Sequence, residues 1–388
     1  YNLIMDDKKY LDYEYLYKQP FTITNIGSGV CIIVINQTTK INGVTTDSLY
    51  NYNVFDSNNV SVDPLIEFKH KIKFGITDVY IKLKPKESLS ICAKNDSVFK
   101  LNDSYVHVIN NINVDDSITY DHSIELSGNI NSLLTSNFTD ENIRLDPGCF
   151  QGLFSENSAL KHTDKLVLPS KYLSYRCYQD MFNGCINLLT PPKILPANKI
   201  PTCAYKNMFR NCQNLIYIPD ILATQFNADC CTAMFARCLK LSDISNFPKD
   251  FDYICMCAFY DMFTACCNLK IFPKYFKIKN KVESNAFTCL FDRNLILGRD
   301  SHNIDVYFDE NKAEPAAFDL TGDNSNSITS SAFSITSSAF RNNYLFRIQR
   351  LKFIPISNSP LSVFRKYYFG FKLDNSDSEC SESVLEKQ

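Results

Sequence analysis

Cysteine is the residue type in this chain that offers the most chemistry. Thirteen of the sixteen cysteines lie between Cys149 and Cys289. Thiolates bind zinc, form disulfides and act as nucleophiles. The clusters Cys230-Cys231, Cys255-Met-Cys257 and Cys266-Cys267 are the places to look for such chemistry.

The spacing of these residues does not favour a metal site or a covalent catalyst. Structural zinc needs two pairs of Cys or His, each pair separated by about two to four residues, and the chain has no such double pair. The five histidines, His70, His107, His122, His162 and His302, are scattered singly. Only His162 lies in the cysteine-rich segment, and nothing singles out one thiol as a nucleophile. We therefore expect no metal, no cofactor and no catalytic residue, since an enzyme would need a converging polar site.

The cysteines instead follow an internal repeat. Its aromatic anchors are Phe154, Phe182, Phe209, Phe235, Phe263 and Phe291, with spacings of 28, 27, 26, 28 and 28 residues. A leucine stands six residues after each anchor, and a cysteine stands three residues after four of the six. A period in the twenties is typical of units that stack into one continuous core. The predicted repeat core is Phe154, Met181, Phe182, Cys185, Leu188, Met208, Phe209, Cys212, Leu215, Met234, Phe235, Cys238, Leu241, Met262, Phe263, Cys266, Leu269 and Phe291.

The position five residues before each anchor indicates what the thiols do. It holds Cys149, Cys177, Ala204, Cys230, Ala258 and Ala286. Cysteine and alanine share small volume, which favours buried free thiols over strict disulfide pairing. The extra cysteines Cys203, Cys231, Cys255, Cys257 and Cys267 leave room for one or two disulfides, whose connectivity a sequence does not reveal.

Each unit reads as a short helix followed by an extended stretch. In the second unit, Cys177, Met181, Phe182 and Cys185 fall on one face of a helix. Asn183-Gly184 suits a left-handed helix end, and the prolines that follow keep the next residues extended. The pattern predicts an α/β repeat solenoid.

Three stretches carry a family resemblance. They are Cys177-Tyr-Gln-Asp-Met-Phe-Asn-Gly-Cys-Ile-Asn-Leu, Cys203-Ala-Tyr-Lys-Asn-Met-Phe-Arg-Asn-Cys-Gln-Asn-Leu and Cys257-Ala-Phe-Tyr-Asp-Met-Phe-Thr-Ala-Cys-Cys-Asn-Leu. They resemble the BspA-type leucine-rich-repeat surface proteins, in a Cys-Tyr-x-x-Met-Phe-x-x-Cys-x-x-Leu variant. Residues 124–134 also resemble the lead-in before such repeats in proteins of gut bacteria and their phages. The resemblance implies a curved ladder of strands and helices displayed on a cell or particle surface, with no catalytic residues. The end units depart from the pattern, with Asn157 and Asn294 at the cysteine position.

The regions around the repeat complete the predicted fold class, a leucine-rich-repeat-like α/β solenoid preceded by an antiparallel β-sandwich and followed by a short β element. Period-2 alternation in segments such as Lys71-Ile-Lys-Phe predicts the sandwich. The short β element would gain most by adding to another sheet, its own or a partner's. The predicted ranges are an N-terminal arm at 1–20, the sandwich at 21–140, about six repeat units at 141–300, a linker at 301–340, the β element at 341–373 and a loose tail at 374–388.

Composition limits the classes of partner. Lys and Arg number 40 against 42 Asp and Glu, so no bulk positive field attracts nucleic acid. The apolar runs are far shorter than the roughly 20 residues of a membrane span. We expect a non-enzymatic surface protein that contacts other protein subunits or a host-surface receptor, as an oligomer or part of a larger assembly. Tyr205, Tyr217, Tyr260 and Tyr275 are the candidate contact surface, with packing in the core as the alternative.

Location follows from the resemblance and the N-terminal residues. A phage virion component, such as a capsid or tail appendage, is the first expectation, because the lead-in fits it and no secretion signal is visible in the given residues. A secreted or cell-surface adhesin of a bacterium or protist is the alternative. Both would use the ladder's exposed face as a contact surface.

Overall fold

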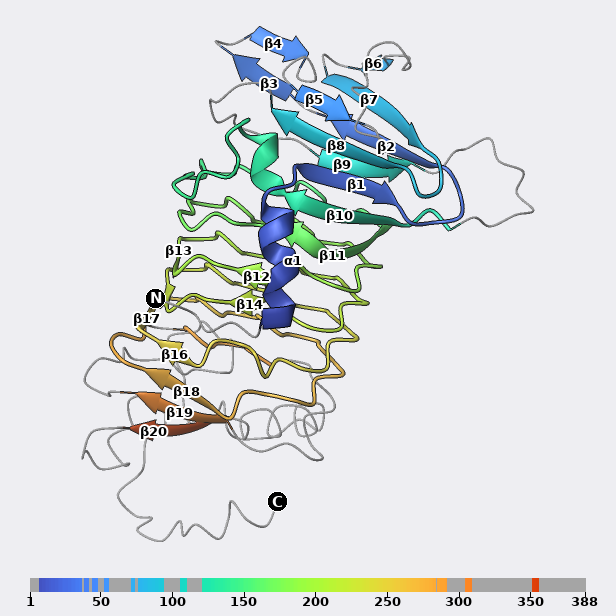
Figure 1. Ribbon diagram of the computed structural model, residues 1–388. Helices are drawn as coiled ribbons and strands as arrows, with labels where there is room; N and C mark the ends of the chain where they lie inside the picture. Colours follow the sequence, from blue (N-terminus) through green and yellow to red (C-terminus); the bar gives the residue numbers. More distant parts are fainter. Residues whose placement is uncertain are drawn as a thin grey trace, which may run out of the picture.

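The computed structural model describes residues 7–36, 38–41, 44–47, 52–55, 71–73, 76–93, 105–109, 121–283, 285–291, 304–308 and 351–355. In Figure 1 the N-terminal strands lie at one end of the molecule, and a stack of short strands and turns extends from them. The stack carries one unit for each phenylalanine anchor, and we number these units 1 to 6.

The N-terminal region forms two main sheets. One has the strand order β11-β10-β1-β8-β5 and the other the order β6-β7-β2-β9, while β3 and β4 pair as a hairpin. Strand β1 alternates between buried and half-buried residues, as its period-2 sequence predicts. The elements are α1 (Asp7–Tyr17), β1 (Phe21–Asn25), β2 (Cys31–Asn36), β3 (Thr38–Ile41), β4 (Val44–Asp47), β5 (Tyr52–Phe55), β6 (Lys71–Lys73), β7 (Ile76–Leu83), β8 (Ser88–Ala93), β9 (Tyr105–Ile109), β10 (Ile124–Asn129), the 3-10 helix η2 (Ile130–Leu133) and β11 (Leu160–Val167).

The stack is held by short parallel strands from successive units. The strand orders are β12-β14, β13-β15-β17 and β16-β18-β19-β20, and each strand pairs in parallel with the next in its order. The elements are β12 (Ile194–Leu195), β13 (Lys199–Ile200), β14 (Asp220–Ile221), β15 (Gln225–Phe226), β16 (Asp250–Phe251), β17 (Tyr253–Ile254), β18 (Tyr275–Ile278), β19 (Ile304–Phe308) and β20 (Leu351–Pro355). Strand β19 lies in the range predicted as a linker, and β20 lies in the predicted C-terminal β element. The tail at 374–388 and the rest of that element lie outside the described residues.

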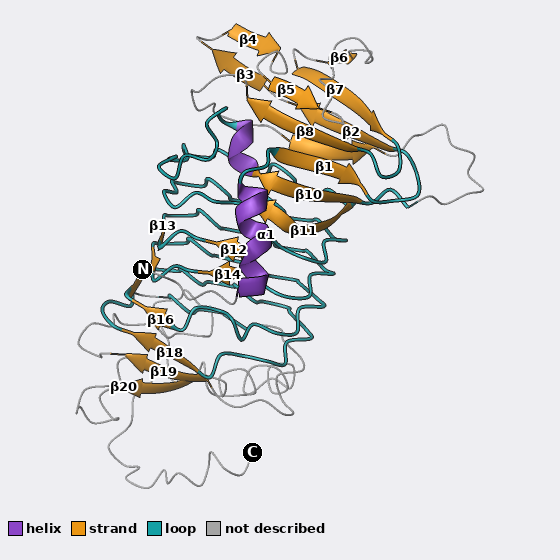
Figure 2. Cartoon of the chain, in the orientation of Figure 1, coloured by secondary structure: helices purple, strands orange, loops and turns teal. Residues whose placement is uncertain are grey.

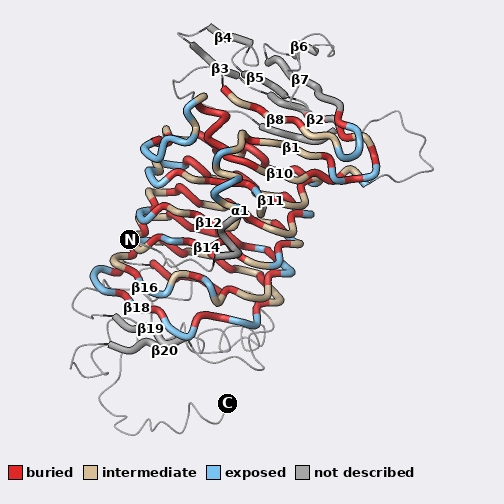
Figure 3. The backbone as a smooth tube through the Cα atoms, viewed as in Figure 1, coloured by how far each residue is buried: buried red, intermediate tan, exposed pale blue. Residues whose placement is uncertain are grey.

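The N-terminal sheet and the stack share one core. Strand β11 belongs to unit 1 and pairs in parallel with β10, so the sheet continues directly into the stack. The rings of Phe21 and Phe154 lie 5.9 Å apart across this junction. One hydrophobic cluster extends from Phe21 to Phe291, and Figure 3 shows the buried interior running along the stack. The sheet therefore covers the N-terminal end of the stack.

Backbone N–H groups around the anchors of units 1 to 5 alternate between two kinds of partner. In unit 2 the N–H of Met181 donates to the carbonyl of Tyr178 at 3.3 Å, which closes a local turn. The next N–H, on Phe182, donates to the carbonyl of Met208 in unit 3 at 2.9 Å. Alternate residues therefore bind the neighbouring unit, and the segment becomes one rung of a ladder.

This bonding shows why the predicted helix does not form. An α-helix sends each N–H to the carbonyl four residues earlier and keeps φ negative. Here every fourth residue is left-handed, as at Asp180 with φ 57° and Gly184 with φ 77°. The side chain of Asp180 accepts a hydrogen bond from Asn183 Nδ2 at 3.1 Å, and such local bonding helps Asx residues adopt positive φ.

The predicted fold class, an α/β repeat solenoid after an antiparallel β-sandwich, is therefore wrong. The described residues are mostly strands and turns in several small sheets, and α1 is their only α-helix (Figure 2). The helix prediction failed because half of the N–H groups that a helix needs bind the next unit. The sheet that joins the stack is also mixed rather than antiparallel, since β11 pairs with β10 in parallel.

The anchor rings form one column through the core. Successive ring centroids are 5.2 to 5.8 Å apart from Phe154 to Phe291, and the planes are tilted by at most 17°. Every residue of the predicted repeat core is at most 5% exposed. Each ring pair adds about 0.5–1.5 kcal/mol beyond the free energy of burial alone.

A second aromatic column has a gap in unit 4. It runs through Phe150, Tyr178 and Tyr205, and resumes with Phe259 and Phe287. Between them, the position in unit 4 is occupied by Cys231, whose N–H bonds the residue before Phe259. The same unit carries the larger Phe226 in a neighbouring column, where units 3 and 5 have Ile200 and Ile254. The Phe226 ring lies 4.9 Å from the Phe259 ring.

We predict that these two positions compensate each other in volume. Cys231→Phe alone should cost about 1–3 kcal/mol of unfolding free energy by overpacking. Adding Phe226→Ile should recover most of that loss, because unit 4 would then resemble units 3 and 5, with Ile200 and Ile254 at this position. Urea unfolding of both single variants and the double variant measures the coupling. Additive losses would contradict the prediction.

Candidate contact face

On one side of the stack, the segments four to eight residues after the anchors carry exposed aliphatic side chains. Ile186 is 38% exposed, Ile216 44%, Leu239 39% and Ile271 50%. They come from units 2 to 5, at positions four, seven or eight residues after the anchors. We call this set the aliphatic face.

Backbone pairing places these residues in adjacent columns. The N–H of Ile216 donates to Leu189 at 3.2 Å, and the N–H of Ile271 donates to Ser242 at 3.1 Å. Isolated parallel bridges join Tyr217 to Asp243 and Asp243 to Ile271. The column that contains Leu189, Ile216 and Ser242 ends in Lys161 in unit 1 and Lys270 in unit 5. The first column is therefore apolar at Leu189 and Ile216, whereas the second column holds Tyr217 and Asp243 before it reaches Ile271.

A row of asparagines fixes the face between units. Asn187 Nδ2 donates to the Ser158 carbonyl, Asn214 Nδ2 to that of Ile186, and Asn268 Nδ2 to that of Leu239, each at 2.8 Å. Unit 4 has Lys240 at this position instead. These bonds hold the backbone beside the exposed aliphatic residues in a defined geometry.

The N-terminal end of the face carries a polar cluster. Thr190 Oγ1 donates to Asp164 Oδ1 at 2.7 Å and lies 3.0 Å from His162 Nδ1. Because the threonine's single proton is directed at Asp164, its oxygen accepts from His162, which places a proton on Nδ1. Tyr217 adjoins this group, and burial raises its pKa to about 12, with the Asp164 charge adding to the effect. The cluster links unit 1 to units 2 and 3.

The thiols three residues after the anchors do not reach this face. Each cysteine three residues after an anchor donates through Sγ to the anchor carbonyl of the preceding unit, at 3.0 to 3.2 Å, as Cys185 does to Phe154. Burial raises the pKa of Cys177 and Cys185 to about 12, which keeps both thiols neutral. No disulfide joins any two cysteines of the described ranges, and no group of three or more His, Cys, Asp or Glu side chains there could hold a metal ion. These thiols act as small hydrogen-bond donors inside the core.

The predicted contact tyrosines do not share one surface. Tyr205 is 1% exposed and packs 6.0 Å from the Tyr178 ring, so its assignment to the contact surface is wrong. Its position directly follows the small Cys or Ala five residues before the anchor, and both positions point inward. Tyr217 and Tyr260 are half-buried on different segments, and Tyr275 is exposed on β18.

Sequence reasoning missed the aliphatic face. The available signal was the asparagine that recurs one residue before the leucine that follows an anchor by six residues, at Asn187, Asn214 and Asn268. Cross-unit amide bonding at that position would have identified a solvent-facing side of the stack. No family model, curated protein or solved structure matches this chain. The single α-helix in the described part is α1, with 11 residues, and no helix there is suited to span a membrane.

Proposed function

We propose that this chain is a non-enzymatic structural protein that joins a larger assembly through its aliphatic face. The observation that supports it is the set of Ile186, Ile216, Leu239 and Ile271, exposed one to a unit over four successive units on a backbone held by cross-unit amide bonds. Exposed apolar side chains with polar residues around them are typical of protein contact sites.

The rigid backbone strengthens the proposal. Binding costs conformational entropy for every side chain or loop that becomes ordered at the interface. The inter-unit bonds have already ordered this backbone, so a partner would meet a preformed surface. Of surface assemblies, we propose a virion, in line with the resemblance of residues 124–134 and of the repeat.

A pair of aspartate substitutions tests the face. Ile216→Asp with Leu239→Asp should reduce incorporation into purified particles at least about tenfold, because two charges would enter the apolar centre of the contact. Immunogold imaging with an antibody against residues 150–290 measures incorporation. Folding should be unaffected, since all changed side chains are exposed.

The control introduces two aspartates at exposed apolar residues elsewhere on the stack. Leu222 and Met256, 40% and 47% exposed, lie outside the aliphatic face, and Leu222→Asp with Met256→Asp should be incorporated normally. Labelling of the cell envelope instead of particles would favour an adhesin over a virion component. Equal incorporation of both double variants would refute the aliphatic face as the contact.

A further inference from the structure

Strand β18 and the residues beside it present a row of lysines to solvent. Along β18 the exposed residues Tyr275 and Lys277 alternate with the buried Phe276 and Ile278. Lys274 and Lys279, just outside the strand, are exposed as well. Residues 274–281 contain four lysines and no carboxylate. The sequence signal for this row was lysine at alternate positions, at 277, 279 and 281.

Strand β16, which pairs with β18, and the residues beside it place both lysine and aspartate next to this row. The Lys249 carbonyl accepts the N–H of Lys277 at 2.7 Å, which places exposed Lys249 next to the row. Asp250 stands opposite Lys277 in the parallel register. Asp252 forms an ion pair with Lys279 at 3.5 Å.

The other charged residues near this row are Lys281, Glu283 and Asp305. Lys281 binds Glu283 at 2.6 Å, and Asp305 of β19 stands opposite Tyr275 in register. Within the described residues, Lys249, Lys274 and Lys277 form no ion pair. They define a cationic strip along β18 and the adjoining end of β16, with Asp250 and Asp252 at its edge.

The width and spacing of the strip restrict the anion that fits it. Outward residues on one strand are about 6.7 Å apart, twice the rise per residue. Nucleic acid places its phosphates densely and is held by broad positive surfaces. Here Asp250 and Asp252 would repel a dense row of phosphates. Anionic groups spaced along a single extended chain would instead meet the lysines and avoid the aspartates.

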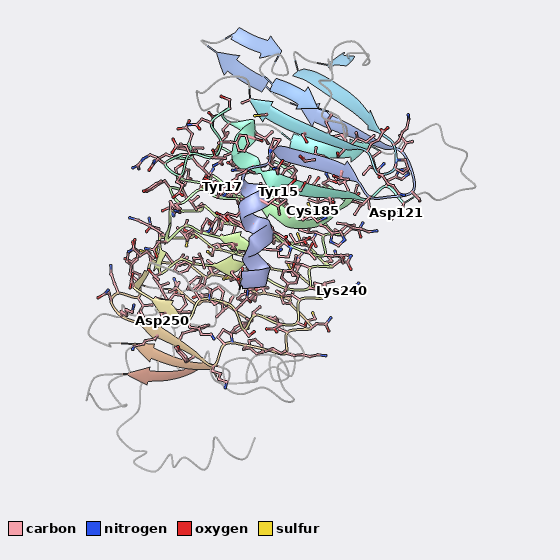
Figure 4. All side chains as sticks on the ribbon, in the orientation of Figure 1. Tyr15, Tyr17, Asp121, Cys185, Lys240 and Asp250 are labelled. Atoms are coloured by element: carbon pink, nitrogen blue, oxygen red, sulfur yellow. The ribbon has the colours of Figure 1, made fainter. Side chains whose placement is uncertain are left out.

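Tyr275 completes the strip with an exposed ring, 38% accessible to solvent. A tyrosine offers a flat apolar face and a polar hydroxyl, which suits the apolar face of a sugar ring and its hydroxyl groups. We propose that Lys249, Lys274, Tyr275 and Lys277 bind an acidic polysaccharide, with its carboxylates on the lysines and a sugar ring on Tyr275. Figure 4 shows Asp250 and Lys240 at opposite edges of the stack, so this strip is separate from the aliphatic face.

Binding of the whole chain to immobilised alginate, a carboxylated polysaccharide, tests the proposal. At about 50 mM salt, where screening is weak, the wild type should bind, and binding should weaken as salt is raised. Lys274→Glu with Lys277→Glu should weaken binding at least about tenfold. Tyr275→Ala should weaken binding severalfold without changing the salt dependence, because it removes stacking and no charge.

The matched control is Lys240→Glu with Lys270→Glu, two charge reversals on exposed lysines outside the strip. It should bind alginate nearly as the wild type does. Equal loss in both double variants, or no binding by the wild type, would overturn the proposal. So would an oligothymidylate that binds as tightly with the same dependence on Lys274 and Lys277. Particle incorporation is a separate assay, so failure of this strip leaves the proposed function testable.

Discussion

Met208→Asp is expected to unfold the stack of units. Met208 is fully buried beside the anchor Phe209, and its carbonyl accepts the N–H of Phe182 from the preceding unit. An aspartate there would place a carboxylate among the fully buried side chains of the core, such as Phe182 and Phe209. Burying such a charge costs several kcal/mol, comparable with the roughly 5–15 kcal/mol that stabilises an ordinary domain.

Lys240→Asp introduces the same side chain on the surface. Lys240 is exposed at the edge of the stack (Figure 4), and its backbone N–H still donates to Gln213. The change should alter the unfolding free energy by no more than about 0.5 kcal/mol. Thermal unfolding followed by circular dichroism, with size-exclusion chromatography at room temperature, compares the variants. A cooperative transition of Met208→Asp near that of the wild type would show that the Phe209 layer is not a shared core.

The second large expected effect is a loss of stability in alkali. Burial raises the pKa of Cys177 and Cys185 to about 12, and burial also raises that of Cys212, Cys238 and Cys266. An unfolded thiol titrates near 9, so between pH 9 and 12 the folded state binds more protons than the unfolded state. Stability is therefore fully present below pH 9 and falls as pH rises towards 12. Each thiol contributes a loss on the order of 1 kcal/mol per pH unit in this range.

Urea unfolding from pH 8 to pH 11, in the presence of a reductant, measures this slope. Cys177→Ala is the matched variant, because units 3, 5 and 6 carry Ala204, Ala258 and Ala286 at the same position. This variant should lower the difference in bound protons between the folded and unfolded states by one, which makes the slope shallower. The free energy of unfolding at neutral pH should change little. A slope that stays the same in this variant would mean that Cys177 does not titrate from a buried site.

The sequence predicted the core better than the backbone. The anchors, the leucines and the small residues before them are buried, because their period of 26 to 28 residues reflects stacking directly. The local pattern was ambiguous. Buried pairs such as Cys177-Tyr178 and Met181-Phe182 recur every four residues, which a helix face and a series of turns both produce. Only the destination of the backbone hydrogen bonds separates these two structures, and side-chain periodicity carries no information about it.

The functional surfaces were harder to predict for a related reason. An exposed isoleucine such as Ile186 and a buried one such as Ile200 differ in neither residue type nor hydropathy. Their exposure depends on which column of the stack they occupy. Tyrosine content therefore gave a misleading contact surface, as the buried Tyr205 shows. The exposed lysines of β18 could have been found, because the alternation there has the simple period of a strand.

The ladder of N–H groups also bears on how such a chain changes in length over evolution. The bond offset between neighbouring units varies, from 26 residues between Tyr178 and Ala204 to 25 between Tyr205 and Cys230 and 27 between Cys231 and Ala258. The rungs themselves stay aligned, so the proline-containing connections absorb the difference. Gene duplication of one whole unit would lengthen the protein without disturbing the existing rungs. A deletion inside a rung would instead leave N–H donors of one unit without carbonyl acceptors in the next. Lineages of this protein should differ by complete levels and by loop insertions.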